Sequence, residues 1–138
     1  MDINPYSDHR NAYIDRLNNN PLDVEAAVYL GNTYYDNNEP AQAIVYYTIA
    51  LQIKPDQPDV KTDLGAMYWR AGILSYAERT FREVVGDFPG FANAKLNLGL
   101  LLQQALGRAT EAHQIFRDVA GDFPNEPAGR KALELLQG

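Results

Sequence analysis

The chain has no cysteine, so disulfide bonds and metal sites built on thiolates are excluded. Histidine and tryptophan are also scarce, with two and one among 138 residues. Basic residues are in the minority: 12 Lys and Arg stand against 18 Asp and Glu, for a formal net charge of -6. Because neutralisation of phosphate supplies most of the affinity for nucleic acids, this charge argues against a nucleic-acid partner.

Long apolar runs are missing as well. The longest near-apolar stretch, residues 41–51, has about half the length of a membrane span and contains Gln42. The opening residues 1–5 lack the basic region and apolar run of a secretory signal. We therefore expect no membrane insertion.

The remaining composition is that of an ordinary globular domain. Apolar residues make up 46% and charged residues 22% of the chain, which supplies enough material for a core and excludes disorder as the main state. A length of 138 residues suits one domain.

Prolines reveal an internal repeat. Pro21, Pro55 and Pro89 are spaced by 34 residues, and Pro124 follows after 35. The pairs Leu-Gly at 30–31, 64–65 and 98–99 keep the spacing of 34. Small and aromatic residues follow the same frame at Ala43, Ala77 and Ala112 and at Tyr47, Phe81 and Phe116. One extra residue therefore lies between Gly99 and Ala112, near residues 104–107.

At these positions the chain resembles the tetratricopeptide repeat family, whose 34-residue pattern is W-x2-L-G-x2-Y, then A-x3-F, then P. The early Trp is replaced by Ala27, Lys61 and Lys95, and Leu102 replaces the Tyr of the third repeat. The resemblance implies an all-α, right-handed superhelical solenoid of helix–turn–helix repeats with flanking capping helices, eight helices in total. Gly31, Gly65 and Gly99 are expected where two helices of a pair touch.

We divide residues 1–138, as a single domain, by this frame. Residues 7–23 form an N-terminal partial repeat whose helix is predicted over 8–18. Residues 24–57, 58–91 and 92–126 form repeats one to three, and residues 127–137 form a C-terminal capping helix. Gly86 and Gly121 are predicted to end the second helices of repeats two and three, because glycine is common just past a helix end.

Few residues of the chain are candidates for catalysis. His9 stands next to Ser7 and Asp8, but adjacent residues on a helix do not face one another. His113 falls on the outer face of its helix, where a solvated histidine is expected. No His-x3-His or His-x2-Glu pair occurs, and no glycine-rich phosphate loop is present. Asp56, Asp59 and Asp63 cluster, but they lack the glycine and terminal Glu of a calcium loop. We therefore predict no catalytic residue, no metal site and no cofactor.

A concave groove is what the family resemblance implies instead, lined by the first helix of each repeat. The groove positions in this chain are Val28, Asn32, Tyr35, Asp36, Thr62, Asp63, Ala66, Trp69, Arg70, Asn93, Asn97, Leu100 and Gln104. Tyr35 and Trp69 occupy the same position one repeat apart. They are either anchors for a partner or packing residues against the neighbouring repeat.

Chaperone-binding members of the family hold a C-terminal carboxylate with five Lys, Arg and Asn residues. Those positions hold Val28, Asn32, Asp63, Asn93 and Asn97 here, and only Asn32 matches. A heat-shock chaperone C-terminus is therefore not the expected partner. Acids outnumber bases in the groove, which favours a neutral or basic apolar segment.

The sequence thus predicts a non-catalytic module that binds a protein or peptide. The alternatives are a regulatory or scaffold domain of a larger enzyme or envelope-associated assembly protein, and a structural module whose groove holds another copy. The acidic charge favours a monomer over a homodimer. The chain as given favours a cytoplasmic location. A periplasmic one applies if the domain is cut from a longer protein, since Phe-Pro repeat ends (88–89, 123–124) are similar to those of periplasmic family members.

Overall fold

The computed structural model describes the backbone of residues 5–138 and the side chains of residues 9–138. Within these residues it contains eight helices and no strand. The helices are α1 (Pro5–Asn19), α2 (Val24–Asp36), α3 (Pro40–Ile53), α4 (Pro58–Arg70), α5 (Leu74–Asp87), α6 (Ala92–Gln104), α7 (Ala109–Asp122) and α8 (Pro127–Gln137). The prediction of an all-α solenoid is confirmed.

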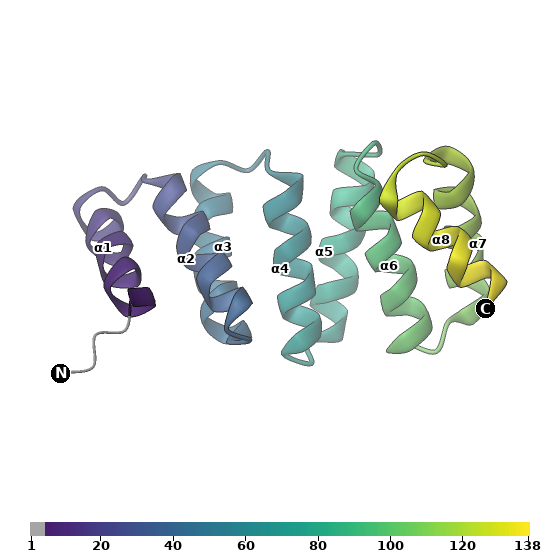
Figure 1. Cartoon of the computed structure of the whole chain (residues 1–138), viewed down its shortest axis with the longest axis horizontal. Helices are drawn as coiled ribbons and strands as arrows, with labels where there is room; N and C mark the ends of the chain where they lie inside the picture. Colours follow the sequence, from purple (N-terminus) through teal and green to yellow (C-terminus); the bar gives the residue numbers. More distant parts are fainter. Residues whose placement is uncertain (1–4) are drawn as a thin grey trace.

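Consecutive helices stack in a row. Helices α2 and α3, α4 and α5, and α6 and α7 pack as pairs, and α3 packs on α4 as α5 does on α6. Figure 1 shows the elongated molecule that results, with α1 at one end and α7 and α8 at the other. None of the helices in residues 5–138 combines the length and the apolar character that crossing a membrane requires.

Three glycines allow the paired helices to touch. A side chain at Gly31, Gly65 or Gly99 would collide with the ring of Tyr47, Phe81 or Phe116 of the partner helix. At Gly65, a Cβ atom would lie 2.5 Å from Cε1 of Phe81. The expected close approach at these three positions is confirmed. A fourth case, Gly129 of α8, is new: its Cβ would collide with the carbonyl oxygen of Phe123.

The turns inside the pairs follow the same frame. Each contains one residue with positive φ: Asn38 (56°), Gly72 (79°) and Gly107 (66°). The turns after α2 and α4 have three residues, and the turn after α6 has four, residues 105–108. The extra residue of repeat three thus lies where the spacing predicted it.

Two predictions about helix ends are wrong. Helices α5 and α7 continue through Gly86 and Gly121 and end at Asp87 and Asp122. Neither glycine has a positive φ. The helices extend past these glycines and end just before Phe88 and Phe123, because each of these precedes a proline, which disfavours a helical conformation in the residue before it.

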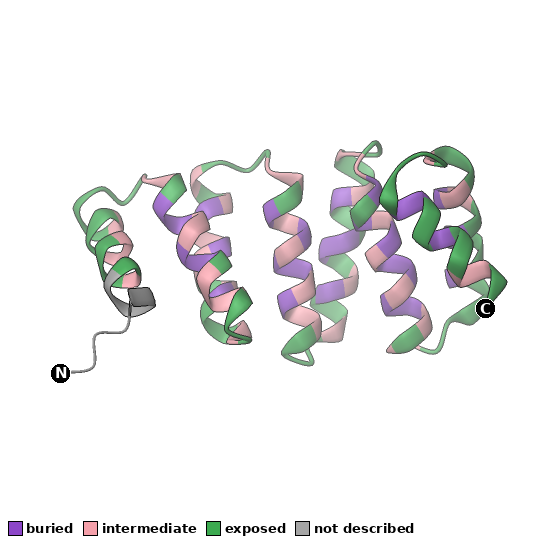
Figure 2. Cartoon of the chain, viewed as in Figure 1, coloured by how far each residue is buried: buried purple, intermediate pink, exposed green. Residues whose placement is uncertain are grey.

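Helix α1 begins at Pro5, three residues before the predicted start at residue 8. Proline fits the first turn of a helix, where its missing N–H is not needed. Residues 9–19 of α1 are exposed or half-buried, whereas α2 to α8 each bury at least three residues (Figure 2). The core therefore extends from α2 to α8.

Candidate functional site

The first helices of the three repeats, α2, α4 and α6, carry the predicted groove residues. Exposed at the surface are Asn32, Asp36, Arg70, Asn93 and Gln104. Half-buried are Val28, Tyr35, Asp63, Ala66, Trp69, Asn97 and Leu100. Thr62 is different: it is 4% exposed, and its hydroxyl donates a hydrogen bond to the carbonyl of Pro58 at 2.7 Å. The prediction of Thr62 as a surface position of the groove is corrected accordingly.

Five of the predicted residues lie around one hollow, which we call the Trp69 hollow. The hollow has a volume of about 410 Å³ and is lined by Tyr35, Ala66, Trp69, Arg70, Phe81 and Asn97. These residues come from α2, α4, α5 and α6, so the repeat spacing brings together side chains far apart in the chain. Phe81 is the one lining residue that was not among the predicted groove positions. Phe81 is fully buried, and its ring lies against Gly65 of α4.

Arg70 connects the first two repeats at the rim of this hollow. Its guanidinium lies over the ring of Tyr35, 4.7 Å from the ring centre. Its Nη1 also donates to the carbonyl oxygen of Tyr35 at 3.4 Å. Tyr35 thus packs against the neighbouring repeat, as one of the two interpretations of this residue proposed. Trp69 packs against the core formed by α5 to α8.

Acidic side chains gather between α2 and α4. Burial, and after it the negative charges of Asp59 and Asp36, raise the pKa of the Asp63 carboxyl to about 6. The hydroxyl of Tyr47 donates to Oδ1 of Asn32 at 2.6 Å. Burial and then the charge of Asp63 raise the pKa of Tyr47 above its ordinary value. Near neutral pH this part of the groove is therefore negatively charged.

The other predicted residues lie apart from the Trp69 hollow. Val28 and Asn32 line a second hollow of about 360 Å³, together with Lys54 and Gln57. Asn93 borders a third hollow of about 190 Å³ near the start of α8. The predicted groove is thus a surface with several depressions, and the Trp69 hollow is the one that both Tyr35 and Trp69 border.

The candidate metal ligands of the chain are the two histidines and the acidic residues. Among residues 9–138, no group of three or more His, Cys, Asp or Glu lies close enough to hold a metal ion. His113 is exposed on α7, with its ring 6.3 Å from that of Phe116. His9 is exposed on α1, and the side chains of Ser7 and Asp8 lie outside the described residues.

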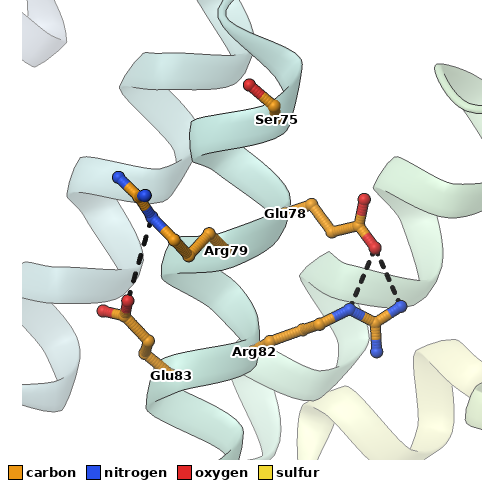
Figure 3. Close-up of a pocket in the computed structure, with 5 residues that line it drawn as sticks. All are labelled: Ser75, Glu78, Arg79, Arg82 and Glu83. Carbon is orange, nitrogen blue, oxygen red and sulfur yellow. Dashed lines mark hydrogen bonds and ion pairs between the residues drawn. The ribbon is translucent and has the colours of Figure 1, made fainter.

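A hollow of about 450 Å³ on the outer face of α5 is lined by Ser75, Glu78, Arg79, Arg82 and Glu83. Figure 3 shows Arg82 paired with Glu78, at 2.9 Å, and Arg79 paired with Glu83. Arg108 reaches Glu78 at 2.7 Å, and Arg82 also pairs with Glu111 of α7. This network, which was not predicted from the sequence, links repeats two and three. Because these charges satisfy one another, they form a structural contact between α5 and α7.

Comparisons with known proteins support the 34-residue repeat and the helical fold. The family model for the tetratricopeptide repeat matches residues 10–58 and 62–127. A crystal structure of MamA is similar in fold, with a TM-score of 0.80 and 18% identity over 96% of this chain and 85% of that one. A second MamA crystal structure has a TM-score of 0.82 and 20% identity, covering 96% and 72%. The tetratricopeptide domain of Arabidopsis OM64 has a TM-score of 0.71 and 20% identity, covering 83% and 93%. No curated protein matches the chain.

Proposed function

Because the chain belongs to the tetratricopeptide repeat family, we propose that it is a non-catalytic binding module whose concave groove takes a basic, partly apolar peptide segment. The family fold indicates a protein–protein interaction or scaffold module, and the family is generally non-catalytic. The stacked helices of such solenoids create extended concave surfaces suited to this use.

The observation that carries the proposal is the Trp69 hollow. Two aromatic residues one repeat apart, Tyr35 and Trp69, border it together with Arg70. Its volume of about 410 Å³ suits one or two apolar side chains of a bound segment. Aromatic residues and arginine are the residue types most enriched among energetically dominant interface positions.

Charge supports the basic character of the segment. Asp59 and Asp36 lie close enough to Asp63 for their charges to raise its pKa, and Arg70 already contacts Tyr35. A lysine or arginine near these acids would lower their mutual repulsion. Electrostatic complementarity of this kind acts mainly on the association rate and on the choice of partner.

The test uses Trp69, the only tryptophan, as a reporter. A panel of synthetic peptides pairs leucine or phenylalanine with lysine and arginine, and a matched panel has glutamate in place of the basic residues. Basic peptides should shift the Trp69 emission to the blue, and acidic ones should not. Calorimetry then measures binding by Tyr35→Ala and Trp69→Ala, each expected to lose about 2 kcal/mol if it is a true anchor.

Controls separate the groove from the rest of the surface. Asp63→Lys should slow association with a basic peptide, while His113→Ala on α7 should leave its affinity unchanged. Circular dichroism checks that each variant is folded. If both aromatic variants are folded and bind as tightly as the original chain, the binding site lies outside the groove and the proposal fails.

A further inference from the structure

Asp63 places a charge at a repeat position that is otherwise uncharged. The equivalent residues of the first and third repeats are Tyr29 and Asn97. The Asp63 carboxyl lies half-buried on α4, and burial together with the charges of Asp59 and Asp36 raises its pKa to about 6. The stack of helices therefore does not require a charge at this position, and the folded chain carries the charge against a cost.

The two basic residues of the same helix are engaged elsewhere. Nζ of Lys61 pairs with Oε2 of Glu83 at 2.7 Å, and the guanidinium of Arg70 lies over the ring of Tyr35. Neither base lowers the pKa of Asp63, whose shift comes from burial and from negative charges. A cation supplied by a ligand would therefore meet an acid that α4 itself does not neutralise.

Asp63 lies on the same face of α4 as the Trp69 hollow. Residues three and seven positions further along a helix share the face of the first residue. After Asp63 these residues are Ala66 and Arg70, and both line the hollow. The α4 residues of the hollow lie on average about five positions beyond Asp63, which corresponds to about 8 Å along the helix axis.

We propose that Asp63 selects the partner segment by pairing with a lysine or arginine two residues from the apolar side chain that fills the Trp69 hollow. Alternate side chains of an extended segment point to the same side and lie about 6.7 Å apart, and the length of a basic side chain covers the remaining distance to Asp63. Adjacent side chains point to opposite sides, so a basic residue next to the apolar one would face away from Asp63.

This assignment rests on the proposed binding of a basic, partly apolar segment, and it adds the spacing that the groove selects. An apolar recess beside an unneutralised acid is complementary to a segment that carries an apolar and a basic side chain on one side. Composition alone would not distinguish such a segment from its isomers. The spacing of the two side chains does, because Asp63 and the hollow have fixed places on one helix.

The experiment compares short peptides of identical composition with blocked ends, at about pH 7.5, where Asp63 is ionised. Each peptide has one leucine and one lysine among alanines and serines, and only the positions of these two residues differ. The Trp69 emission, followed during titration, gives the dissociation constant. The better of the two orders Lys-x-Leu and Leu-x-Lys should bind about fivefold more tightly than peptides in which the two residues are adjacent.

Matched variants of the chain identify the acid responsible. Asp63→Asn installs the residue type that the third repeat carries at this position, and it should abolish the preference for spacing. Asp15→Asn removes the same charge from the exposed face of α1 and should keep the preference. Circular dichroism confirms that both variants stay folded. Glutamine in place of the lysine should make all isomers bind equally.

Failure of this assignment is distinguishable from failure of the proposed function. If no peptide of the series changes the Trp69 emission, the proposed function fails and the assignment fails with it. If the peptides bind but the isomers have equal affinity, the groove binds a segment without selection by Asp63, and the assignment alone is overturned. A preference that persists in Asp63→Asn overturns it as well.

Discussion

At the scale of single residues, glycines set the distance between paired helices. Gly65 faces the ring of Phe81, whereas Gly86, also inside a helix, has open space where a Cβ atom would lie, with no neighbouring atom within 4 Å. A side chain would therefore clash at Gly65 and would fit without a clash at Gly86. One is required by a contact, and the other lowers helix stability without a packing reason.

Alanine substitution separates the two roles. Gly65→Ala should lower the free energy of unfolding by about 1–3 kcal/mol, because the new methyl group is forced against Phe81. Gly86→Ala should raise it by roughly 0.5–1 kcal/mol, since alanine restricts the unfolded chain and favours the helix. Urea denaturation followed by circular dichroism measures both. A stabilising Gly65→Ala would contradict the packing described for α4 and α5.

A second residue-scale prediction concerns Asp63. The folded chain raises its pKa to about 6 through burial and the charges of Asp59 and Asp36, so the folded state holds the proton more tightly than the unfolded state. Asp63 therefore lowers stability progressively as the pH rises from about 4 to about 6. Asp63→Asn should remove this loss and stabilise the protein near neutral pH by up to about 1 kcal/mol, once solvent screening is allowed for.

Thermal unfolding at two pH values tests whether the charged form of Asp63 destabilises the folded protein. The gain in melting temperature from Asp63→Asn should be present at about pH 7.5 and absent at about pH 4, where the carboxyl is already protonated. Asp15→Asn, on the exposed face of α1, serves as a control and should change little at either pH. A gain of equal size at both pH values would show that the charge of Asp63 is not the cause.

At the scale of elements, the turns between paired helices differ in one residue type. Asn38 adopts the left-handed conformation that glycine adopts at the equivalent positions 72 and 107. Asn38→Gly should stabilise the protein by roughly 0.5 kcal/mol, because glycine has no Cβ penalty there. Gly72→Ala, where the space is open, should cost about 1 kcal/mol through backbone strain alone. Chemical denaturation measures the free energy of unfolding of both variants, which should change in opposite directions.

The elements also show what sequence can predict. The 34-residue frame located the paired helices, the close-contact glycines and the longer turn after α6, because these features repeat and depend on local spacing. It did not predict the burial of Thr62, the contact at Gly129 or the ion pairs between α5 and α7. Each of these depends on where a second element lies, and a single repeat pattern does not contain that information.

The candidate site also combines features that the sequence predicted with features that only the structure shows. The family resemblance, applied through the repeat frame, assigned Tyr35, Trp69 and Asn97 to one groove, and the structure arranges them around one hollow. Their role in binding stays a prediction. The contribution of Phe81 to the hollow and the stacking of Arg70 on Tyr35 required three-dimensional contacts between helices. A repeat frame therefore identifies a face of the molecule, while the shape of that face comes from packing.

At the scale of the whole molecule, the two end helices differ in how they join the core. Helix α8 buries Ala128, Gly129 and Ala132 and packs Leu135 and Leu136 against the core formed with α5 to α7. Helix α1, over residues 9–19, buries no residue fully: Tyr13 stacks on Tyr29 with the ring centres 3.7 Å apart, Arg16 pairs with Asp23, and Leu17 packs against the core of α2 to α4. In a stack where each repeat contacts only its neighbours, the stability added by an end element depends on its single interface.

Truncation should therefore affect the two ends unequally. A chain that stops at Glu126 loses α8 and should lose about 3 kcal/mol or more, the order expected for the burial of two alanines and the partial burial of two leucines. A chain that begins at Pro21 loses α1 and should lose only about 2 kcal/mol, the order expected for one aromatic stack, the contact of Arg10 with the Tyr34 ring and one partly buried leucine. Urea denaturation of both truncated chains, at concentrations low enough to keep them monomeric, measures the difference. A larger loss from removing α1 than from removing α8 would mean that the stack is stabilised from its first helix, contrary to the burial pattern of the two ends.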